Sequence, residues 1–345
     1  MTGAVQVHRA KGQVARVFLD RAGAVERRVR IVERGDFVQI PLKRALDGAE
    51  MAKARELGGE LVELAEAVPR DVRVSPIDNV RTSLDIPEEA KAQLPEKWEM
   101  LGDVLVLKLD SGLDRWLTGI AAAYARELGA RTVLREVAHI TGQFREPQVV
   151  KLWGGGTETV HLENGIRYKM DAAKLMFASG NIDERQRMAT ISKPGETVVD
   201  MFAGIGYFTL PLAKYSRPAR VVAHEINPVS HSYLVENVAL NGLDNIEPRL
   251  GDCANAEEGI ADRVLMGYVG TTHLYLRKAI RILRGPGVIH YHETCPNALL
   301  AERPRGRVLD AARAEGVKAE IVRMREVKSY APGVSHVVLD IMIVI

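Results

Sequence analysis

Three acidic residues at the ends of successive predicted strands are the part of this sequence best suited to chemistry. Asp200, Glu225 and Asp252 each follow a short run rich in apolar or β-branched residues, as expected of buried parallel strands. The carboxyl ends of such strands meet at one edge of a sheet, where nucleotides bind. Glu225 is placed to accept hydrogen bonds from a ribose diol, and Asp252 with the Cys253 backbone to meet the exocyclic amine of adenine. The spacing therefore predicts a nucleotide site.

The glycine turn that follows Asp200 indicates which nucleotide is bound. Gly204 and Gly206 allow the backbone to approach a ligand where a side chain would clash. A dinucleotide-binding loop needs a third glycine, but Phe208 and Thr209 stand there instead. An acidic residue before the turn also repels a pyrophosphate, whereas it suits a sulfonium or an ammonium group. The sequence favours S-adenosylmethionine over a nicotinamide dinucleotide, and it disfavours a fold of this shape that binds nothing.

Alternating strands and helices must position these residues. Beyond about Asp171, strands are predicted near residues 197, 220, 246, 263, 287, 319 and 336, with helices between them. This pattern predicts an α/β protein with a doubly wound, mainly parallel, seven-stranded sheet in a catalytic domain at 171–345. Smaller α+β domains are expected before it, an N-terminal module at 1–75 and a middle domain at 76–170, with a boundary near Pro76.

The first half of the chain contains shorter predicted elements. Strands are expected at 14–19, 37–40, 103–109, 131–138 and 161–169, the last interrupted by a turn at Glu163-Asn164-Gly165. Helices are expected at about 45–67 and 113–128.

Composition limits the class of protein. The 345 residues give room for two or three domains, and the absence of a long apolar run argues against secretion and a membrane span. Cys253 and Cys295 have no metal-ligand spacing and form no disulfide framework, which fits a reducing cytoplasm and no metal. The net charge of +2 does not by itself indicate nucleic acid, but residues 1–50 hold ten Lys/Arg against six Asp/Glu. A phosphate-facing patch and a solvated basic face fit that excess equally well.

Several motifs together resemble a known family, over at least residues 94–345. They are 177–185 (FASGNIDER), 200–208 (DMFAGIGYF), 224–228 (HEINP), 237–242 (NVALNG) and 251–253 (GDC). This set resembles the archaeal and eukaryotic enzymes that act on position 37 of tRNA. One branch is the tRNA guanine-37 N1-methyltransferases; the other is the tRNA wybutosine-synthesising aminocarboxypropyltransferases, which modify 4-demethylwyosine at C7. The resemblance implies a class I methyltransferase-like Rossmann fold, S-adenosylmethionine as co-substrate and the anticodon loop of tRNA(Phe) as partner of a monomeric enzyme.

The fourth strand of the predicted sheet separates the two branches. Enzymes that methylate a nitrogen commonly carry Asn-Pro-Pro-Tyr there, whose carbonyls accept hydrogen bonds from the target amine. This chain has Gly267-Tyr268-Val269 instead. With Gly180-Asn181 and His290-Tyr291-His292-Glu293, this form resembles the aminocarboxypropyl branch. The resemblance implies transfer of the 3-amino-3-carboxypropyl group to C7 of 4-demethylwyosine-37, with release of methylthioadenosine. A guanine-37 N1-methyltransferase and a non-catalytic tRNA-binding protein stay as alternatives.

The resemblance also implies contacts at the amino-acid end of the cofactor. Ser179 and Arg185 are expected there, with the forked guanidinium of Arg185 pairing with the cofactor carboxylate. The family often has Ser at the position after Phe177. This chain has Ala178 there, so any hydroxyl contact with the cofactor is expected from Ser179. The predicted cofactor-binding residues are Ala178, Ser179, Arg185, Asp200, Glu225, Asp252 and Cys253.

No general base is identified from the sequence. His290 and His292 form a His-x-His-Glu pattern that resembles a metal site, but alternating residues on one strand face are more often packed or hydrogen-bonded, and no third ligand cluster supports a metal.

Three further residues each have two interpretations. Glu184 fits a catalytic carboxylate or, more simply, an ion pair with Arg185 or Arg187. Tyr268 fits a residue that stacks on the target base, or a core tyrosine. Arg145 fits a phosphate or substrate contact, or a solvated surface residue.

Overall fold

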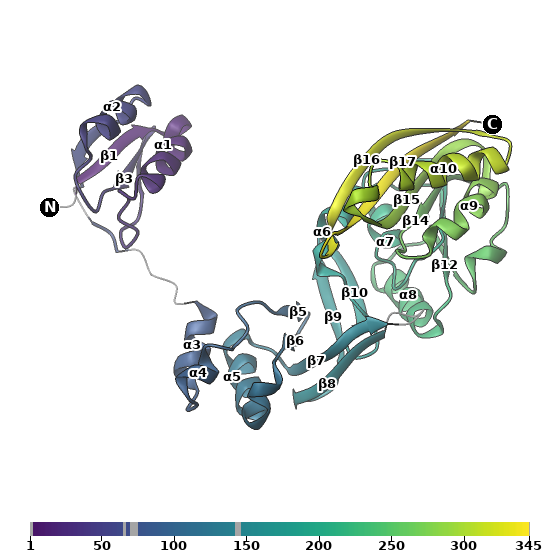
Figure 1. Ribbon diagram of the computed structural model, residues 1–345, viewed down its shortest axis with the longest axis horizontal. Helices are drawn as coiled ribbons and strands as arrows, with labels where there is room; N and C mark the ends of the chain where they lie inside the picture. The colour runs from purple at the N-terminus through teal and green to yellow at the C-terminus, as the bar shows by residue number, and fades with distance from the viewer. Residues whose placement is uncertain (1–2, 65–66, 70–74, 142–145, 345) are drawn as a thin grey trace. The chain divides into compact units, whose positions relative to one another are not determined.

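The structure, a computed structural model, describes residues 3–64, 67–69, 75–141 and 146–344. The chain divides into two units, Met1–Ser75 and Pro76–Ile345 (Figure 1). No helix within the described ranges combines the length and the apolar character that crossing a lipid bilayer requires.

The first unit is a four-stranded antiparallel sheet with two helices. The strands lie in the order β2 (Val32–Arg34), β3 (Phe37–Pro41), β1 (Gly3–His8) and β4 (Glu60–Glu63). Its core joins Val5, Val7 and Ile40 of the sheet to Ala15 and Leu19 of α1 (Arg9–Arg21). The strand predicted at 37–40 is confirmed.

Two other predictions for this unit are wrong. The strand predicted at 14–19 lies inside α1, because Ala15 and Leu19, four residues apart, bury one face of a helix. The helix predicted at 45–67 is only α2 (Gly48–Glu56). It stops before Gly58, which has a positive φ of 76° and suits a helix terminus, and β4 follows.

The second unit begins with a helical layer on a four-stranded sheet. The sheet order is β5-β6-β7-β8, and β6 and β7 run parallel. Leucines of β6 pack against the alanine-rich face of α5, and this packing forms a separate core. The predicted strands at 103–109 and 131–138 are confirmed, and the helix predicted at 113–128 begins as a 3₁₀ turn. The elements are α3 (Pro76–Ser83), α4 (Glu88–Lys91), β5 (Glu99–Leu101), β6 (Val104–Lys108), a 3₁₀ helix at Ser111–Trp116, α5 (Leu117–Leu128), β7 (Thr132–Thr141) and β8 (Glu146–Gly154).

A β-hairpin leads from this sheet to the larger one. β9 (Glu158–Glu163) pairs antiparallel with β10 (Ile166–Asp171), and the turn between them has positive φ at Asn164 (49°) and Gly165 (75°). Such a turn matches the twist of the paired strands, so the predicted hairpin is confirmed.

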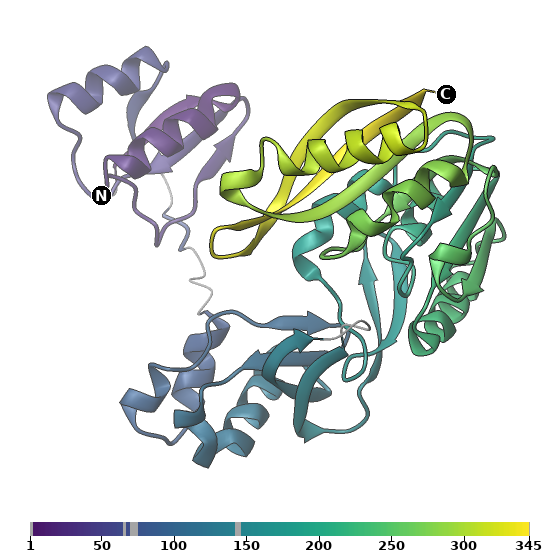
Figure 2. The same cartoon turned by 45° about the vertical axis from the view of Figure 1, so that its right-hand side comes forward.

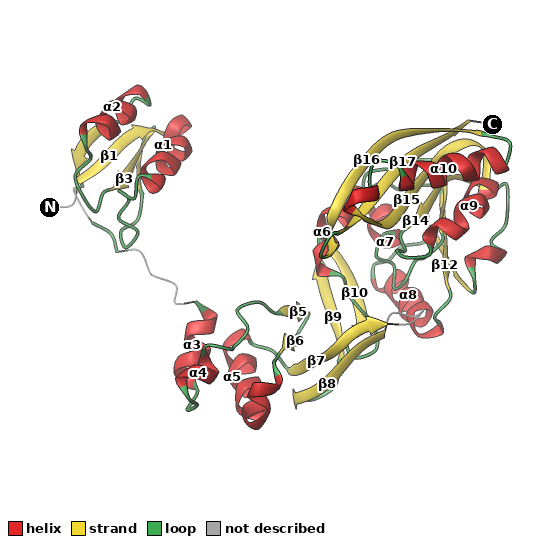
Figure 3. Ribbon diagram, viewed as in Figure 1, coloured by secondary structure: helices red, strands yellow, loops and turns green. Residues whose placement is uncertain are grey.

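The larger sheet has the predicted seven strands, in the order β13-β12-β11-β14-β15-β17-β16. All neighbouring pairs from β13 to β15 are parallel, and β17 is antiparallel to both of its neighbours. The doubly wound, mainly parallel α/β fold is therefore confirmed (Figure 3). Its strands are β11 (Thr197–Asp200), β12 (Arg220–Glu225), β13 (Ile246–Leu250), β14 (Ala261–Met266), β15 (Leu283–Pro296), β16 (Lys318–Ala331) and β17 (Val334–Val344).

Helices cover both faces of this sheet because its strands are apolar on both sides. Val198 faces one core and its neighbour Val199 faces the other. The first core contains residues of α6 (Ile182–Met188), α7 (Thr209–Tyr215) and α8 (Pro228–Leu240). The second contains residues of α9 (Leu276–Ile282) and α10 (Arg303–Ala314). This alternation is the signature of a strand buried on both faces.

Asn237 connects three parts of the second unit. Its side chain is fully buried on α8. It accepts a hydrogen bond from the Lys169 amide (2.6 Å) and donates to the carbonyls of Lys169 and Ile205 (both 3.1 Å). One amide group thus joins α8, the β9–β10 hairpin and the glycine turn.

The turn between β11 and α7 is built around Asp200. Its carboxylate is completely buried and accepts hydrogen bonds from the Thr209 hydroxyl (2.8 Å) and the Phe202 amide (3.1 Å). Burial raises the pKa of Asp200 to about 6. In the turn itself, Gly204 and Gly206 have positive φ (58° and 100°), a conformation that favours glycine.

We expect Asn237→Ala to destabilise the second unit. The change leaves the Lys169 amide and two carbonyls without a partner, which costs about 1–3 kcal/mol. The urea midpoint should fall. Ser232→Ala, on the exposed face of the same helix, is the control and should leave the midpoint nearly unchanged. Equal midpoints for both variants would contradict this role.

We expect Asp200→Asn to change how stability depends on pH. The native pKa of about 6 lies above the ordinary 3.8, so the folded protein binds the proton more tightly than the unfolded chain does. This group's contribution to the free energy of unfolding therefore decreases as pH rises from about 4 to about 6. The asparagine cannot ionise, so the stability of the variant relative to wild type should be higher at pH 8 than at pH 5, by about 1 kcal/mol. Urea unfolding at the two pH values measures this difference, and equal differences would refute the assignment.

Candidate functional site

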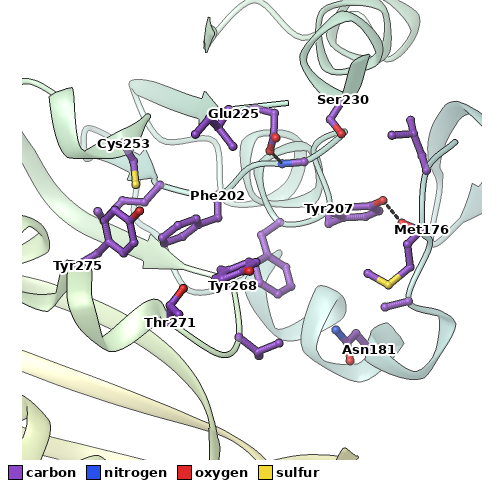
Figure 4. A pocket seen from close by; sticks show the side chains of 18 of the residues that line it. Met176, Asn181, Phe202, Tyr207, Glu225, Ser230, Cys253, Tyr268, Thr271 and Tyr275 are labelled. Carbon is purple, nitrogen blue, oxygen red and sulfur yellow. Dashed lines mark hydrogen bonds between the residues drawn. The ribbon is translucent and has the colours of Figure 1, made fainter. Parts of the chain in front are cut away.

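A pocket opens at the carboxyl ends of the parallel strands (Figure 4). Its walls come from the turns after β11, β12, β13 and β14, from the segment before α6 and from the β16–β17 hairpin. In both ribbon views this hairpin is the yellow pair of strands at one edge of the larger sheet (Figures 1 and 2). The residues that line it include Met176, Ala178, Asn181, Arg185, Phe202, Gly204, Tyr207, Phe208, Glu225, Asp252, Cys253, Gly267, Tyr268, Val269, Tyr275, Lys328, Tyr330 and His336.

Glu225 lies at the end of β12 and faces both the pocket and two loops. One carboxylate oxygen accepts a hydrogen bond from the Gly204 amide (2.7 Å), and the other accepts one from the Asn227 amide (2.8 Å). Burial raises the pKa of Glu225, and these backbone donors oppose the rise. Each carboxylate oxygen has two lone pairs, so acceptor capacity is left for ligand hydroxyls. Glu225 lines the pocket, and its contact with the ribose hydroxyls stays a prediction.

Asp252 and Cys253 line the pocket beside an aromatic cluster. The Asp252 carboxylate accepts the Ala254 amide (2.8 Å), and this bond fixes the start of a 3₁₀ turn. The Phe202 ring stacks on Tyr268 with centroids 5.4 Å apart, and Tyr275 meets Phe202 edge-on at 5.4 Å. Flat apolar surfaces beside a carboxylate suit a planar base that carries an amine.

Asp200 does not line the pocket, which corrects the expectation that it contacts the cofactor. Its two oxygens are directed at Thr209 and Phe202, inside the turn. The residue shapes the loop that forms the pocket wall. The sequence pattern located the strand end correctly, but it did not reveal which way the carboxylate points.

The segment before α6 also differs from expectation. Ala178 lines the pocket, whereas Ser179 is exposed and lies outside the lining, so the lining does not support the hydroxyl contact expected of Ser179. Arg185 lines the pocket, yet its fork is occupied: Nε and one terminal nitrogen donate to Glu163 (both 2.6 Å), and the other donates to the Ala178 carbonyl (2.7 Å). This corrects the pairing of that fork with a cofactor carboxylate.

Several pocket residues were not predicted from the sequence as cofactor contacts. The Oδ1 atom of Asn181 is buried without a hydrogen-bond partner among the described residues. The Tyr207 hydroxyl donates to the Met176 carbonyl and fixes that wall. Lys328, Tyr330 and His336 come from the β16–β17 hairpin, more than a hundred residues beyond the glycine turn. Only the FASGN motif could have indicated Asn181; no local signal marks the hairpin residues.

The two histidines of the His-x-His-Glu pattern are hydrogen-bonded side chains. His290 contacts Asp340 (2.5 Å) through Nδ1 and Arg263 (2.8 Å) through Nε2. Because Arg263 only donates, the neutral ring must donate from Nδ1 to Asp340. His292 Nδ1 lies 3.0 Å from His336 Nε2. Burial lowers the pKa of both His290 and His292.

Glu184 forms ion pairs, as one of its two interpretations predicted. Its carboxylate, with no exposed surface, accepts hydrogen bonds from Arg187 (2.8 Å) and from Arg325. Arg185, the other expected partner, pairs with Glu163 instead. Within the described part of the chain, no group of three or more His, Cys, Asp or Glu side chains is arranged to hold a metal ion. Arg145 lies outside the described residues.

Family profiles match most of the second unit. The profile described as the TRM5/TYW2 methyltransferase domain matches residues 159–322. The profile described as the TYW2 N-terminal domain matches residues 80–157.

Individual proteins are similar over longer stretches. The tRNA(Phe) (4-demethylwyosine(37)-C(7)) aminocarboxypropyltransferase of Methanocaldococcus jannaschii is 47% identical over 249 residues, 71% of this chain and 96% of that protein. The crystal structure of P. horikoshii TYW2 in complex with MeSAdo superposes with a TM-score of 0.72 at 41% identity, covering 78% of this chain and 99% of that one. The tRNA (guanine(37)-N(1))-methyltransferase Trm5b of Pyrococcus abyssi is 32% identical over 342 residues, 99% of this chain and 98% of that protein. With the strand order of the sheet and the pocket at its carboxyl edge, these similarities establish that the chain belongs to the TRM5/TYW2 family.

Proposed function

We propose that the protein transfers the 3-amino-3-carboxypropyl group of S-adenosylmethionine to C7 of 4-demethylwyosine at position 37 of tRNA(Phe), and that methylthioadenosine is released. The observation that carries this proposal is the pocket wall after β14. Gly267, Tyr268 and Val269 form it, so no side-chain amide or proline-fixed carbonyl is present to hold a nitrogen for methylation. A similar protein was solved with MeSAdo, the thioether left when that group departs.

The chemistry requires orientation more than activation. A sulfonium has three electrophilic carbons, and the pocket selects among them by what it places opposite the nucleobase. When C7 attacks Cγ, the C7–Cγ bond forms, the Cγ–S bond breaks, and sulfur leaves as a neutral thioether. Because the leaving group already carries the positive charge, the protein supplies mainly position and a proton acceptor.

The pocket offers groups of suitable chemistry to each part of S-adenosylmethionine. Glu225 has acceptor capacity for the ribose hydroxyls, and Asp252 with the Cys253 backbone for adenine. Asn181 Oδ1, a buried acceptor without a partner among the described residues, fits the ammonium group. Lys328 supplies the positive charge for the carboxylate, the role expected earlier of Arg185. Ala178 lines the same pocket.

A guanine-37 N1-methyltransferase is the second candidate function. One observation favours it: Trm5b of Pyrococcus abyssi matches 99% of this chain, whereas the aminocarboxypropyltransferase relative matches 71%. The pocket wall and the higher identity to the latter favour aminocarboxypropyl transfer. The larger covered share reflects how many residues the two proteins have in common. The pocket wall, in the proposed function, lies next to the reacting atoms, so it is the more specific observation.

The remaining expectations concern partners and organisation. The proposed substrate is the anticodon loop of tRNA(Phe). We propose that the enzyme acts on it in the cytoplasm and as a monomer.

We propose three functional domains, 1–75, 76–170 and 171–345. The unit boundary after Ser75 supports the first division. The family profile changes between residues 157 and 159, which supports a second division but one earlier in the chain than 170.

The small-molecule product tests the proposed function. The protein is incubated with S-adenosylmethionine and tRNA(Phe) that carries 4-demethylwyosine, and the nucleoside products are resolved by chromatography and mass spectrometry. We expect methylthioadenosine and a tRNA heavier by the aminocarboxypropyl group. Release of S-adenosylhomocysteine, with a methyl group on guanine 37 of unmodified tRNA, would refute the proposal in favour of the second candidate.

We expect Glu225→Ala to weaken S-adenosylmethionine binding by about 1–3 kcal/mol, or roughly 5- to 150-fold in Kd. The change removes the acceptors for the ribose hydroxyls and releases the Gly204 and Asn227 amides that shape the pocket. Glu257→Ala, an exposed carboxylate outside the pocket lining, is the control. Calorimetric titration measures both constants, and an unchanged Kd for Glu225→Ala would remove this residue from the site.

A further inference from the structure

The proposed reaction leaves one proton to be removed, and this inference rests on that proposed function. Once C7 is bonded to Cγ and methylthioadenosine has left, the positive charge of the sulfonium resides on the nucleobase. C7 then still carries its hydrogen. Loss of this proton restores the aromatic ring, so a base must reach the pocket.

Most titratable side chains that line the pocket are unsuited to this task. Glu225 and Asp252 accept backbone amides at the nucleoside end. Arg185 and Lys328 are cations. Burial raises the pKa of Cys253 to about 12, so the thiol keeps its proton near neutrality. Burial also raises the pKa of the Tyr275 phenol, and the Tyr207 hydroxyl donates to the Met176 carbonyl.

A histidine of the β16–β17 hairpin has the required chemistry. His336 on β17 lines the pocket and is only 3% exposed. A neutral imidazole is a base that titrates near physiological pH. The Nε2 atom of His336 lies 3.0 Å from the Nδ1 atom of His292 on β15, and the centroids of the two rings are 5.2 Å apart.

His292 lies between His336 of the β16–β17 hairpin and the buried carboxylate of Glu184. Its ring stacks on Phe208 at 5.3 Å. Its Nε2 atom lies 3.4 Å from Glu184 Oε1, although without the geometry of a hydrogen bond. Glu184 is paired with Arg187 and Arg325, so it is held as an anion. The three side chains form a continuous path from the pocket wall to a buried negative charge.

We propose that His336 is the catalytic base that takes the C7 proton, and that His292 and Glu184 position it. With Nε2–H of His292 facing Glu184, its Nδ1 accepts the Nε2–H of His336. In that tautomer the lone pair of His336 resides on Nδ1, and this atom accepts the proton. His292 is suited to the role because burial and the neighbouring His336 lower its pKa well below the ordinary value, which keeps it neutral.

The charge balance of the pocket supports this assignment. The positive charge passes from the sulfonium to the nucleobase and then to the His336 imidazolium, so no net charge is created in a site of low polarity. Among the residues that the structure describes, the Glu184 carboxylate favours the imidazolium. Lys328, opposite His336 in the β16–β17 register, and Arg187, whose charge lowers the pKa of His292, oppose it. The cofactor carboxylate offsets Lys328 in the bound complex.

The test uses the full chain, His336→Gln and a substrate tRNA with deuterium at C7 of 4-demethylwyosine. We expect turnover to fall roughly 100- to 10,000-fold, the usual contribution of general base catalysis. Deuterium should slow the variant by a larger factor than it slows the wild type, because proton loss becomes rate-limiting. The Kd for S-adenosylmethionine should not change, which shows that the pocket is intact. His336→Asn is the second variant in case the first does not fold.

His231→Gln on α8, outside the pocket lining, is the control and should keep wild-type turnover. Turnover of His336→Gln within twofold of wild type, or a loss with no increase in the isotope effect, would overturn the assignment. If wild type releases methylthioadenosine in these experiments, such a result overturns the His336 assignment alone. If wild type releases S-adenosylhomocysteine, the proposed function fails and the inference fails with it.

Discussion

The pocket depends on a carboxylate that holds two loops at the edge of the sheet. Glu225 accepts the Gly204 amide with one oxygen and the Asn227 amide with the other, which fixes the turn after β11 against the start of α8. A half-buried amide without a partner would be costly, so this geometry is strongly preferred. The same carboxylate keeps lone pairs for a ligand. The shape of two loops depends on this side chain, and the ligand recognition that we propose would use the same carboxylate.

Buried ion pairs position the other wall. Arg185 joins Glu163 of the β9–β10 hairpin to the Ala178 carbonyl, while Glu184 of the same helix joins Arg187 and Arg325. Each buried charge has an opposite partner, as buried charges require. The helix α6 is thus anchored to the hairpin on one side and to β16 on the other. The segment with Ala178 and Asn181 is held in place by these anchors.

Relatives of this chain in the TRM5/TYW2 family are named for two different reactions, and we propose that the wall after β14 separates them. The strand order and the carboxyl-edge site determine where a nucleoside cofactor lies. In the proposed function, the wall after β14 faces the group to be modified. Here Gly267 packs so tightly that a Cβ would lie 2.6 Å from the Phe208 ring. A residue with a side chain could not replace it without moving Phe208, which also stacks on His292. The wall and the histidine pair are therefore structurally coupled.

The amino-acid sequence determined the sheet of seven strands, the β9–β10 turn and the strand-end positions of Glu225 and Asp252, because these follow from local periodicity and turn chemistry. Predictions for the first unit were wrong where a short apolar run fits either a strand or a helix, as at 14–19. Only the tertiary structure decided where side chains point. Asp200 faces inward, Arg185 is occupied by Glu163, and the hairpin brings Lys328 and His336 to the pocket. Partners far apart in sequence meet only when the sheet is assembled, and no local pattern encodes such a contact.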